Sequence, residues 1–183
     1  MAKLIIGIVG ENAAGKTTTT EYLKNKFNAV TFRFSDMLAD ILKRMYLEPT
    51  RANFQTLSTI LRQNFSQDIM SNVIAQDAKN STADIIITEG VRRPSDVTHL
   101  KELSNFILIY IKADERTRFS RLTNRGEKPD DATKTWEQFQ EEGKQETEQK
   151  ILEIAQTANF TVDNNGGLEN TYSQLDKIIA QYL

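Results

Sequence analysis

The sequence predicts a single α/β domain in which helices cover both faces of a parallel β-sheet. Short apolar segments alternate along the chain with segments whose apolar residues recur at helical spacing, a pattern typical of parallel sheets. The fourth apolar segment, Asn105–Ile111, has no polar alternation, as expected for a strand that is buried on both faces. A length of 183 residues allows one well-formed core and hardly two. We therefore expect residues 1–183 to form one domain of three layers.

Five segments have the apolar and β-branched composition of strands. In chain order they are Lys3–Val9, Ala29–Phe34, Asp84–Thr88, Asn105–Ile111 and Asn159–Val162. Ligands of parallel sheets bind at the carboxyl ends of the strands. The residues that immediately follow each strand are therefore the first candidates for a functional site.

The stretches between and after the strands are predicted to be helical. Pro49 ends the second helix, because proline cannot continue a helix from its interior. Residues 51–79 form either two helices or one bent helix, and Asp114 is a suitable N-cap. Gly126–Ala132, with Gly, Pro and three acidic residues, is predicted to be a loop. The predicted helices are Lys16–Phe27, Asp36–Leu47, Arg51–Lys79, Pro94–Leu103, Asp114–Asn124, Thr135–Gln156 and Leu168–Leu183.

Composition and charge exclude several classes of function. The chain has no cysteine, which excludes disulfides, thiolate metal sites and a cysteine nucleophile. Its net charge of −2 lacks the basic excess of proteins that bind nucleic-acid phosphates, so we expect no DNA or RNA binding. The apolar run Leu4–Val9 is too short for a signal sequence or a membrane span. We expect a cytoplasmic protein with no membrane association.

The segment after the first strand matches the phosphate-binding loop pattern, reading GENAAGKT over Gly10–Thr17. Backbone N–H groups must converge on a polyphosphate there, and a helix amino terminus adds a favourable dipole. Lys16 is expected to lie between the β- and γ-phosphates as a catalytic residue, and Thr17 to ligate Mg²⁺. The residues predicted to bind ATP are Gly10, Glu11, Asn12, Ala13, Ala14, Gly15, Lys16, Thr17 and Thr18.

A second cluster, Glu89-Gly90-Val91-Arg92-Arg93, follows the third strand. Because the carboxyl ends of parallel strands meet at one edge of a sheet, this cluster is expected beside the phosphate loop. A carboxylate at Glu89 can hold Mg²⁺ through water. A guanidinium at Arg92 can clamp an acceptor phosphate with two hydrogen bonds. We predict Glu89 as a metal-binding residue and Arg92 as an acceptor-binding and catalytic residue.

A third cluster of arginines is predicted on one helix. Arg118, Arg121 and Arg125 stand at i, i+3 and i+7 and share one helical face that leads into the loop at residue 126. Such a face suits a lid that closes over ATP and neutralises the charge of the transferring group. We predict Arg121 and Arg125 as catalytic residues, with Arg121 also binding ATP, and leave Arg118 open between this role and a solvated basic face.

Asp36 follows the second strand and has two alternative roles. It can cap the helix that begins there, since aspartate is common at helix amino termini. It can instead contact the acceptor or accept a hydroxyl proton as a general base. We include Asp36 among the predicted acceptor-binding residues with both alternatives open. The acidic run Glu141–Glu148 is interpreted as a solvated helix face.

Taken together, these motifs resemble the nucleoside monophosphate kinases, in particular the adenylate-kinase-like and dephospho-coenzyme-A-kinase-like branches. The resemblance covers nearly the whole chain, and its segments are Gly10–Thr17, Asp36–Leu38, Glu89–Arg92, Arg121–Arg125 and Val162–Gly166. It implies a phosphate-loop fold with a five-stranded sheet of order 2-3-1-4-5. It also implies an acceptor-binding helical region at about residues 36–80 and a short lid at about residues 121–136. Adenine would lie near Arg121 and phosphates on Arg125.

The activity that this resemblance implies is an ATP-dependent phosphotransferase acting on a small molecule, with Mg²⁺ as cofactor and ATP as phosphoryl donor. A nucleoside or deoxynucleoside monophosphate kinase similar to adenylate kinase is the first prediction. A kinase for an alcohol acceptor such as dephospho-coenzyme A, with Asp36 as base, is an alternative. A protein that binds and hydrolyses ATP as a switch or assembly factor is an alternative of another class.

Two departures from the family pattern concern the acceptor. The adenylate kinases have an arginine that grips the acceptor phosphate where this chain has Ala39. Family members also place arginines beyond the lid, where this chain has Lys134 and Lys144, and a lysine lacks the bidentate fork of arginine. The candidates to replace the missing grip are Arg33, Arg44, Arg51 and Arg62.

Overall fold

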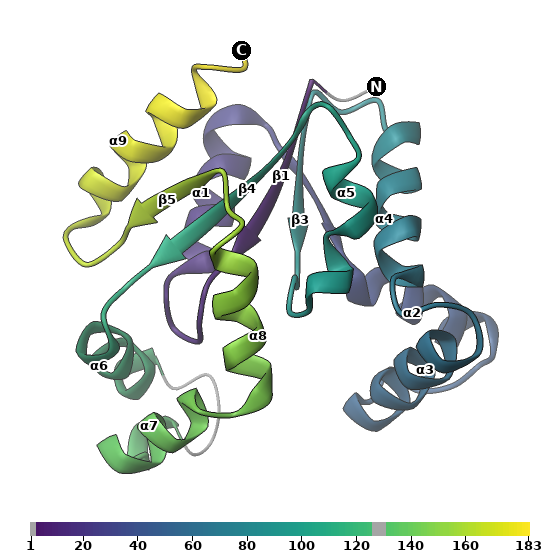
Figure 1. Ribbon diagram of the computed structural model, residues 1–183, viewed down its shortest axis with the longest axis horizontal. Helices are drawn as coiled ribbons and strands as arrows, with labels where there is room; N and C mark the ends of the chain where they lie inside the picture. The colour runs from purple at the N-terminus through teal and green to yellow at the C-terminus, as the bar shows by residue number, and fades with distance from the viewer. Residues whose placement is uncertain (1–2, 126–130) are drawn as a thin grey trace.

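The computed structural model describes residues 3–125 and 131–183 (Figure 1). Its centre is a parallel sheet of five strands in the order β2-β3-β1-β4-β5. The strands are β1 (Leu4–Val9), β2 (Val30–Arg33), β3 (Ile85–Glu89), β4 (Phe106–Lys112) and β5 (Phe160–Asp163). The predicted fold class and strand order are therefore confirmed.

Helices follow each strand in the described ranges. They are α1 (Lys16–Phe27), α2 (Phe34–Arg44), α3 (Arg51–Asn64), α4 (Ile69–Asn80), α5 (Thr98–Lys101), α6 (Glu115–Arg125), α7 (Trp136–Gly143), α8 (Glu146–Ala155) and α9 (Leu168–Ile179), with 3₁₀ turns at Pro94–Asp96 and Asp131–Thr133. The stretch from residue 51 to 79 is two helices rather than one bent helix. The predicted helix Thr135–Gln156 is also divided, because α7 ends at Gly143 and α8 begins at Glu146. The described part of the chain contains no helix long and apolar enough to cross a membrane.

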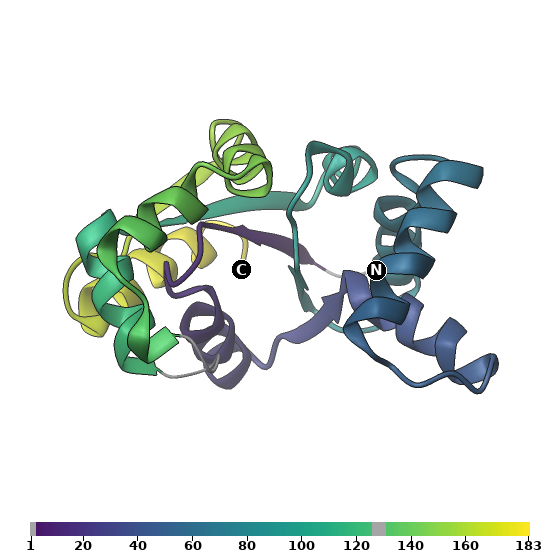
Figure 2. The same ribbon diagram turned by 90° about the horizontal axis from the view of Figure 1, so that it is seen from below.

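Two apolar clusters fill the space between the sheet and its helices. On one face, α1 and α9 contribute Leu23, Leu175 and Ile179, and the rings of Tyr22 and Tyr172 stack at 3.8 Å between the two helices. On the other face, α2, α4, α5 and α8 bury a set that includes Leu38, Ile74, Leu100 and Ile154. Figure 2 shows these two layers of helices on either side of the sheet. The sheet is thus the middle of three layers.

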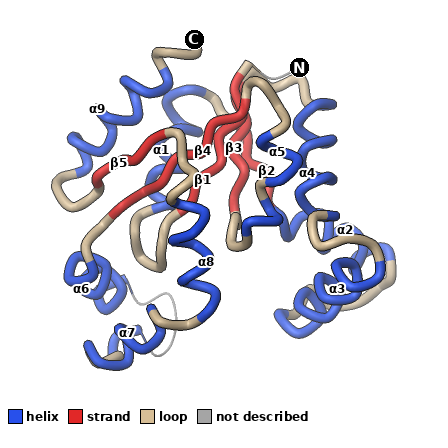
Figure 3. The backbone as a smooth tube through the Cα atoms, viewed as in Figure 1, coloured by secondary structure: helices blue, strands red, loops and turns tan. Residues whose placement is uncertain are grey.

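Two helical extensions lie beyond the carboxyl ends of the strands, on opposite sides of β1. One is formed by α2 and α3, and the other by α6 and α7, as Figures 1 and 3 show. The loop between β1 and α1 begins at the same edge of the sheet. Any site at that edge can therefore receive side chains from both extensions.

Candidate active site

The loop between β1 and α1 requires glycine at two positions. A Cβ at Gly10 would lie 2.6 Å from the carbonyl oxygen of Ile111 in β4, which leaves no room for a side chain. Gly15 has a φ of +101°, and a Cβ there would lie 2.1 Å from Nδ2 of Asn164. Close approach of the backbone therefore requires glycine at position 10, and a positive φ together with close approach requires it at position 15.

Lys16 orients the loop. Its Nζ donates hydrogen bonds to the carbonyl oxygens of Gly10 at 2.7 Å and Glu11 at 2.9 Å. A lysine at this position of a phosphate loop reaches the β- and γ-phosphates. Residues 10–12 are therefore expected at the terminal-phosphate end of the loop. Thr17 and Thr18 are exposed in the first turn of α1, where no described side chain caps the helix and its N–H groups can receive an anion.

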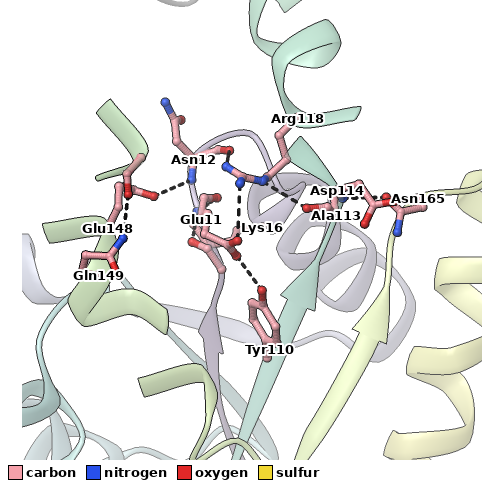
Figure 4. A network of polar contacts seen from close by, with 12 residues as sticks. Glu11, Asn12, Lys16, Tyr110, Ala113, Asp114, Arg118, Glu148, Gln149 and Asn165 are labelled. Carbon is pink, nitrogen blue, oxygen red and sulfur yellow. Dashed lines mark hydrogen bonds and ion pairs between the residues drawn. The ribbon is translucent and has the colours of Figure 1, made fainter. Parts of the chain in front are cut away.

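Glu11 anchors the loop from below (Figure 4). Its side chain is buried, and Oε2 accepts a hydrogen bond of 2.8 Å from the Tyr110 hydroxyl. Nη2 of Arg118 lies 3.6 Å from Oε1, and Nε of Arg118 donates to the carbonyl oxygen of Ala113. Burial, and next the hydrogen bond to Glu11, raise the pKa of Tyr110, which keeps this hydroxyl a donor. Arg118 therefore supports the phosphate loop and is not part of a solvated basic face.

Asn164, in the loop after β5, joins the phosphate loop to α9. Its Nδ2 donates to the carbonyl oxygen of Ala14 at 2.7 Å, and its Oδ1 accepts from the Thr171 hydroxyl at 2.8 Å. Arg121 lies against the same residue, because its Nη2 donates to the carbonyl oxygen of Asn164 at 2.7 Å. Nη1 of Arg121 is buried and has no hydrogen-bond partner within the described structure. A buried cationic donor beside a phosphate loop fits a nucleotide phosphate.

A cavity of about 1110 Å³ extends from this loop between the two helical extensions. Side chains of α3, α6, α7 and α8 meet the phosphate loop and the turn after β3 on its walls. Its lining includes Gly10, Asn12, Ala13, Gly15, Lys16, Thr17, Thr18, Arg51, Gln55, Gly90, Arg92, Arg121, Phe139, Glu142 and Glu148. The fold thus brings seven of the nine loop residues predicted to bind ATP together with Arg121 and Arg92.

The turn that carries Arg92 is held by a buried ion pair. Oδ2 of Asp96 accepts the backbone N–H groups of Arg92 and Arg93, each at 2.9 Å. Its Oδ1 lies 2.7 Å from Nη2 of Arg62, and both side chains are less than one tenth exposed. Arg62 also donates to the carbonyl oxygen of Gln67. Asp96 therefore fixes the backbone from which the Arg92 side chain extends to the cavity.

Of the four arginines proposed to replace the missing acceptor grip, Arg51 lines the cavity. Arg62 forms an ion pair with Asp96, and Nε of Arg33 lies 2.7 Å from the Glu89 carboxylate, so both guanidinium groups already have an acidic partner. Arg44 is exposed on α2 and does not contribute to the lining. Arg51 stands in the first turn of α3, on the same side of the cavity as Gln55.

Glu11 and Ala14 are buried in the phosphate loop outside the cavity lining, and three further predicted site residues also depart from the expected placement. Asp36 is exposed in the first turn of α2 and accepts the backbone N–H of Arg33 at 2.8 Å, which is the capping alternative, and it does not line the cavity. Glu89 also lies outside the lining, so its metal-binding role stays a prediction. Arg125 ends α6, and its side chain lies outside the described part of the structure.

The acidic run interpreted as a solvated face contains two members that are only partly exposed. Glu142 and Glu148 both line the cavity. Glu142 accepts hydrogen bonds of 2.7 and 2.9 Å from Nζ of Lys134, and Oε2 of Glu148 accepts the backbone N–H of Asn12 at 3.3 Å. No periodic signal separates these two from their exposed neighbours, since the run covers the end of α7 and the start of α8.

The side chains that line the candidate site fit an Mg²⁺ ion that is bound together with the nucleotide phosphates better than an ion held by protein side chains alone. Within residues 3–125 and 131–183, no group of three or more His, Asp or Glu side chains is arranged to hold a metal ion. Mg²⁺ in phosphate-loop proteins is bound mainly by the phosphates and a loop hydroxyl. Thr17, exposed at the start of α1, is the residue that would supply this hydroxyl.

Comparisons with known proteins agree with this arrangement. A family model described as an AAA domain matches residues 9–140. The UPF0200 protein MJ1399 of Methanocaldococcus jannaschii is 31% identical over 182 residues, which cover 98% of this chain and 91% of that protein. A UPF0200 protein of Hyperthermus butylicus is 24% identical, with 98% of this chain and 95% of that protein covered.

Solved structures resemble the fold over the full chain. A shikimate kinase from Bacteroides thetaiotaomicron has a TM-score of 0.64 at 14% identity, covering 97% of this chain and 98% of that one. TT1252 from Thermus thermophilus has a TM-score of 0.62 at 14% identity, with both chains covered completely. At this identity the likeness shows the fold alone, which is that of kinase-like phosphate-loop proteins.

Proposed function

The chain belongs to the AAA domain family and to the UPF0200 proteins, and from that premise we propose that it transfers the γ-phosphoryl group of Mg·ATP to a small molecule. The observation that carries this proposal is the meeting of Lys16, Arg92 and Arg121 in one cavity, from three separate parts of the chain. A hydrolase needs only water beside the terminal phosphate. Arginines that line the cavity from outside the phosphate loop, Arg51 and Arg92, favour a second substrate.

The division of labour follows from the positions of these residues. The phosphate loop and Thr17 bind the nucleotide and its Mg²⁺, which neutralises charge on the transferring group. Lys16 binds at the terminal-phosphate end of the loop, and Arg121 supplies a further cationic donor at its other end. Arg92 and Arg51 orient the acceptor. Positioning and electrostatic stabilisation lower the barrier, since phosphoryl transfer requires little covalent participation from the protein.

The acceptor predicted from the sequence motifs is a nucleoside or deoxynucleoside monophosphate. The alternative is a hydroxyl acceptor such as dephospho-coenzyme A, and the position of Asp36 outside the cavity lining weakens the version of it in which Asp36 is the base. Within this proposal the partner is a small molecule, with no DNA, RNA or membrane involved, and the protein acts in the cytoplasm.

Acceptor-dependent formation of ADP tests the proposal. The protein is incubated with Mg·ATP and a panel of nucleoside monophosphates, deoxynucleoside monophosphates, dephospho-coenzyme A and shikimate. At least one acceptor is expected to raise ADP formation well above the acceptor-free rate. Hydrolysis that no acceptor stimulates would contradict the kinase assignment and favour an ATP-hydrolysing switch.

Lys16→Ala provides the accompanying prediction for the donor site. Removing the ammonium takes away a charge that stabilises the transferring group, so turnover is expected to fall at least 10²-fold, as for loss of one transition-state donor. The exposed Lys3→Ala, just before β1, is the matched control and is expected to keep the wild-type rate. Full activity of Lys16→Ala would show that the phosphate loop is misassigned.

A further inference from the structure

Glu148 places a carboxylate at the terminal-phosphate end of the loop. Its Oε2 accepts the backbone N–H of Asn12 at 3.3 Å, and Figure 4 shows the side chain reaching from α8 to the loop. The contact of Lys16 with Gly10 and Glu11 marks this stretch as the end that receives the γ-phosphate. The carboxylate therefore lies next to the position where the phosphoryl group is transferred.

The other carboxylates near the cavity do not reach this position. Glu142 is bound by Lys134, whose side chain is buried. Asp36 and Glu89 do not line the cavity. Glu115 lines it from the first turn of α6 and makes no hydrogen bond to the phosphate loop in the described structure. Among the described carboxylates of the cavity, Glu148 is thus the one with a hydrogen bond to the phosphate loop.

The charge of this side chain discriminates between two kinds of acceptor. The phosphate of a nucleoside monophosphate carries up to two negative charges, which a neighbouring carboxylate repels. A hydroxyl group is neutral and can donate a hydrogen bond to the same carboxylate. A carboxylate at the point of transfer therefore opposes a phosphate acceptor and suits a hydroxyl acceptor.

We propose that the acceptor is a hydroxyl-bearing compound and that Glu148 accepts the proton of the attacking hydroxyl. The proposal rests on the phosphotransferase function above and names the acceptor class of that site. Arg51 and Arg92 line the acceptor side, so the compound carries an anionic group away from the reacting hydroxyl.

The step balances without further reactants. The hydroxyl oxygen forms a bond to the γ-phosphorus, while the bond from that phosphorus to the β,γ-bridging oxygen breaks. ADP leaves with the electron pair of the broken bond. The hydroxyl proton passes to the carboxylate of Glu148 and is then released to water. A general base of this kind contributes about 10²–10⁴-fold to a rate.

Adenosine 5′-tetraphosphate is a probe that does not depend on knowing the acceptor. Bound like ATP, it places a fourth phosphate beyond the γ-position, where the phosphate of a monophosphate acceptor would lie. The experiment measures Kd for ATP and for the tetraphosphate by calorimetry in the presence of Mg²⁺. It uses the full chain as wild type, Glu148→Gln and the control Glu141→Gln, whose side chain is 76% exposed.

Wild type is expected to bind the tetraphosphate at least tenfold more weakly than ATP, and Glu148→Gln to reduce that ratio at least fivefold. Glu141→Gln is expected to keep the wild-type ratio. A ratio that Glu148→Gln leaves unchanged would overturn the proposal, and so would tighter binding of the tetraphosphate than of ATP by wild type. Because the ratio compares two ligands on one variant, a general loss of stability does not move it.

Turnover supplies the second readout. With the acceptor panel extended by nucleosides, hydroxyl compounds are expected to support ADP formation at least tenfold better than any monophosphate. Glu148→Gln is then expected to lower kcat about 10²–10⁴-fold with little change in KM. Preference for a monophosphate, or a kcat within threefold of wild type, would overturn the proposal. If no acceptor raises ADP formation by wild type, the phosphotransferase function is contradicted. The ratio of the two Kd values, for the tetraphosphate and for ATP, still decides the role of Glu148.

Discussion

Replacing Asp96 by alanine is expected to destabilise the protein by about 3–5 kcal/mol, because it leaves a buried guanidinium without its counter-charge. Asp96 and Arg62 are 3% and 7% exposed, and their 2.7 Å contact is closed to water. The backbone N–H groups of Arg92 and Arg93 also lose their acceptor. The loss of these two hydrogen bonds adds little to the loss of stability, since Arg92 and Arg93 are exposed and water can replace the carboxylate as acceptor.

The assay is urea denaturation followed by far-UV circular dichroism. A lower midpoint with an unchanged m-value is expected, which indicates lost stability rather than a changed unfolded state. Arg62→Met combined with Asp96→Ala is expected to lose at least about 1 kcal/mol less than the sum of the single variants, because the uncompensated charge is gone. The control is Glu21→Ala, which removes an exposed ion pair with Lys24 and is expected to change stability by at most about 0.5 kcal/mol.

A loss of less than about 1 kcal/mol for Asp96→Ala would refute this reasoning. It would mean that Arg62 finds water or another acceptor when its carboxylate is removed. The turn after β3 would then be held by its own backbone, and Arg92 would not depend on the ion pair for its position.

Two further predictions concern the loop and the pH dependence of stability. Gly15→Ala is expected to lower the free energy of unfolding by about 1–3 kcal/mol and to abolish ATP binding. The reason is that the residue has a φ of +101° and its Cβ would meet Asn164. Urea denaturation measures the loss of stability, and calorimetry measures the loss of ATP binding. Gly166→Ala, whose Cβ meets no atom within 4 Å, is the control, and equal losses in the two variants would contradict the steric argument. The hydrogen bond from Lys26 lowers the pKa of Asp176, so its contribution to stability is present at neutral pH and is lost as the pH falls through that lowered pKa. The stability difference between wild type and Asp176→Asn, measured by denaturation at several pH values, should therefore shrink in acid, and a difference that grows there would contradict the assignment.

The sequence predicted the fold well because its signals are local. Apolar runs and helical periodicity located all five strands and the helices between them to within a few residues. The helix divisions were harder to predict. Residues 144–145 interrupt the acidic stretch of α7 and α8 without a proline, and the short α5 is separated from a 3₁₀ turn by a single residue.

The candidate site also has one part that the sequence predicts and one part that it does not. The spacing of glycines and lysine in Gly10–Thr17 is enough to predict a phosphate loop, since the geometry that it serves is contained in eight residues. The partners of that loop come from distant segments. Asn164 and Glu148 contact it across 150 and 136 residues of sequence. No pattern in their own neighbourhoods indicates which atoms they meet.

The sequence by itself therefore determined the parallel three-layer fold, the phosphate loop and the position of Arg92 after the third strand. Only the tertiary structure decided which charged side chains reach the cavity: Arg51 among four arginines, and Glu148 within an acidic run. The physical reason is that periodicity indicates which face of a helix is apolar. The direction in which α3 and α8 pass the phosphate loop depends on how the helices pack against the sheet, and that packing decides which polar residues meet the substrate.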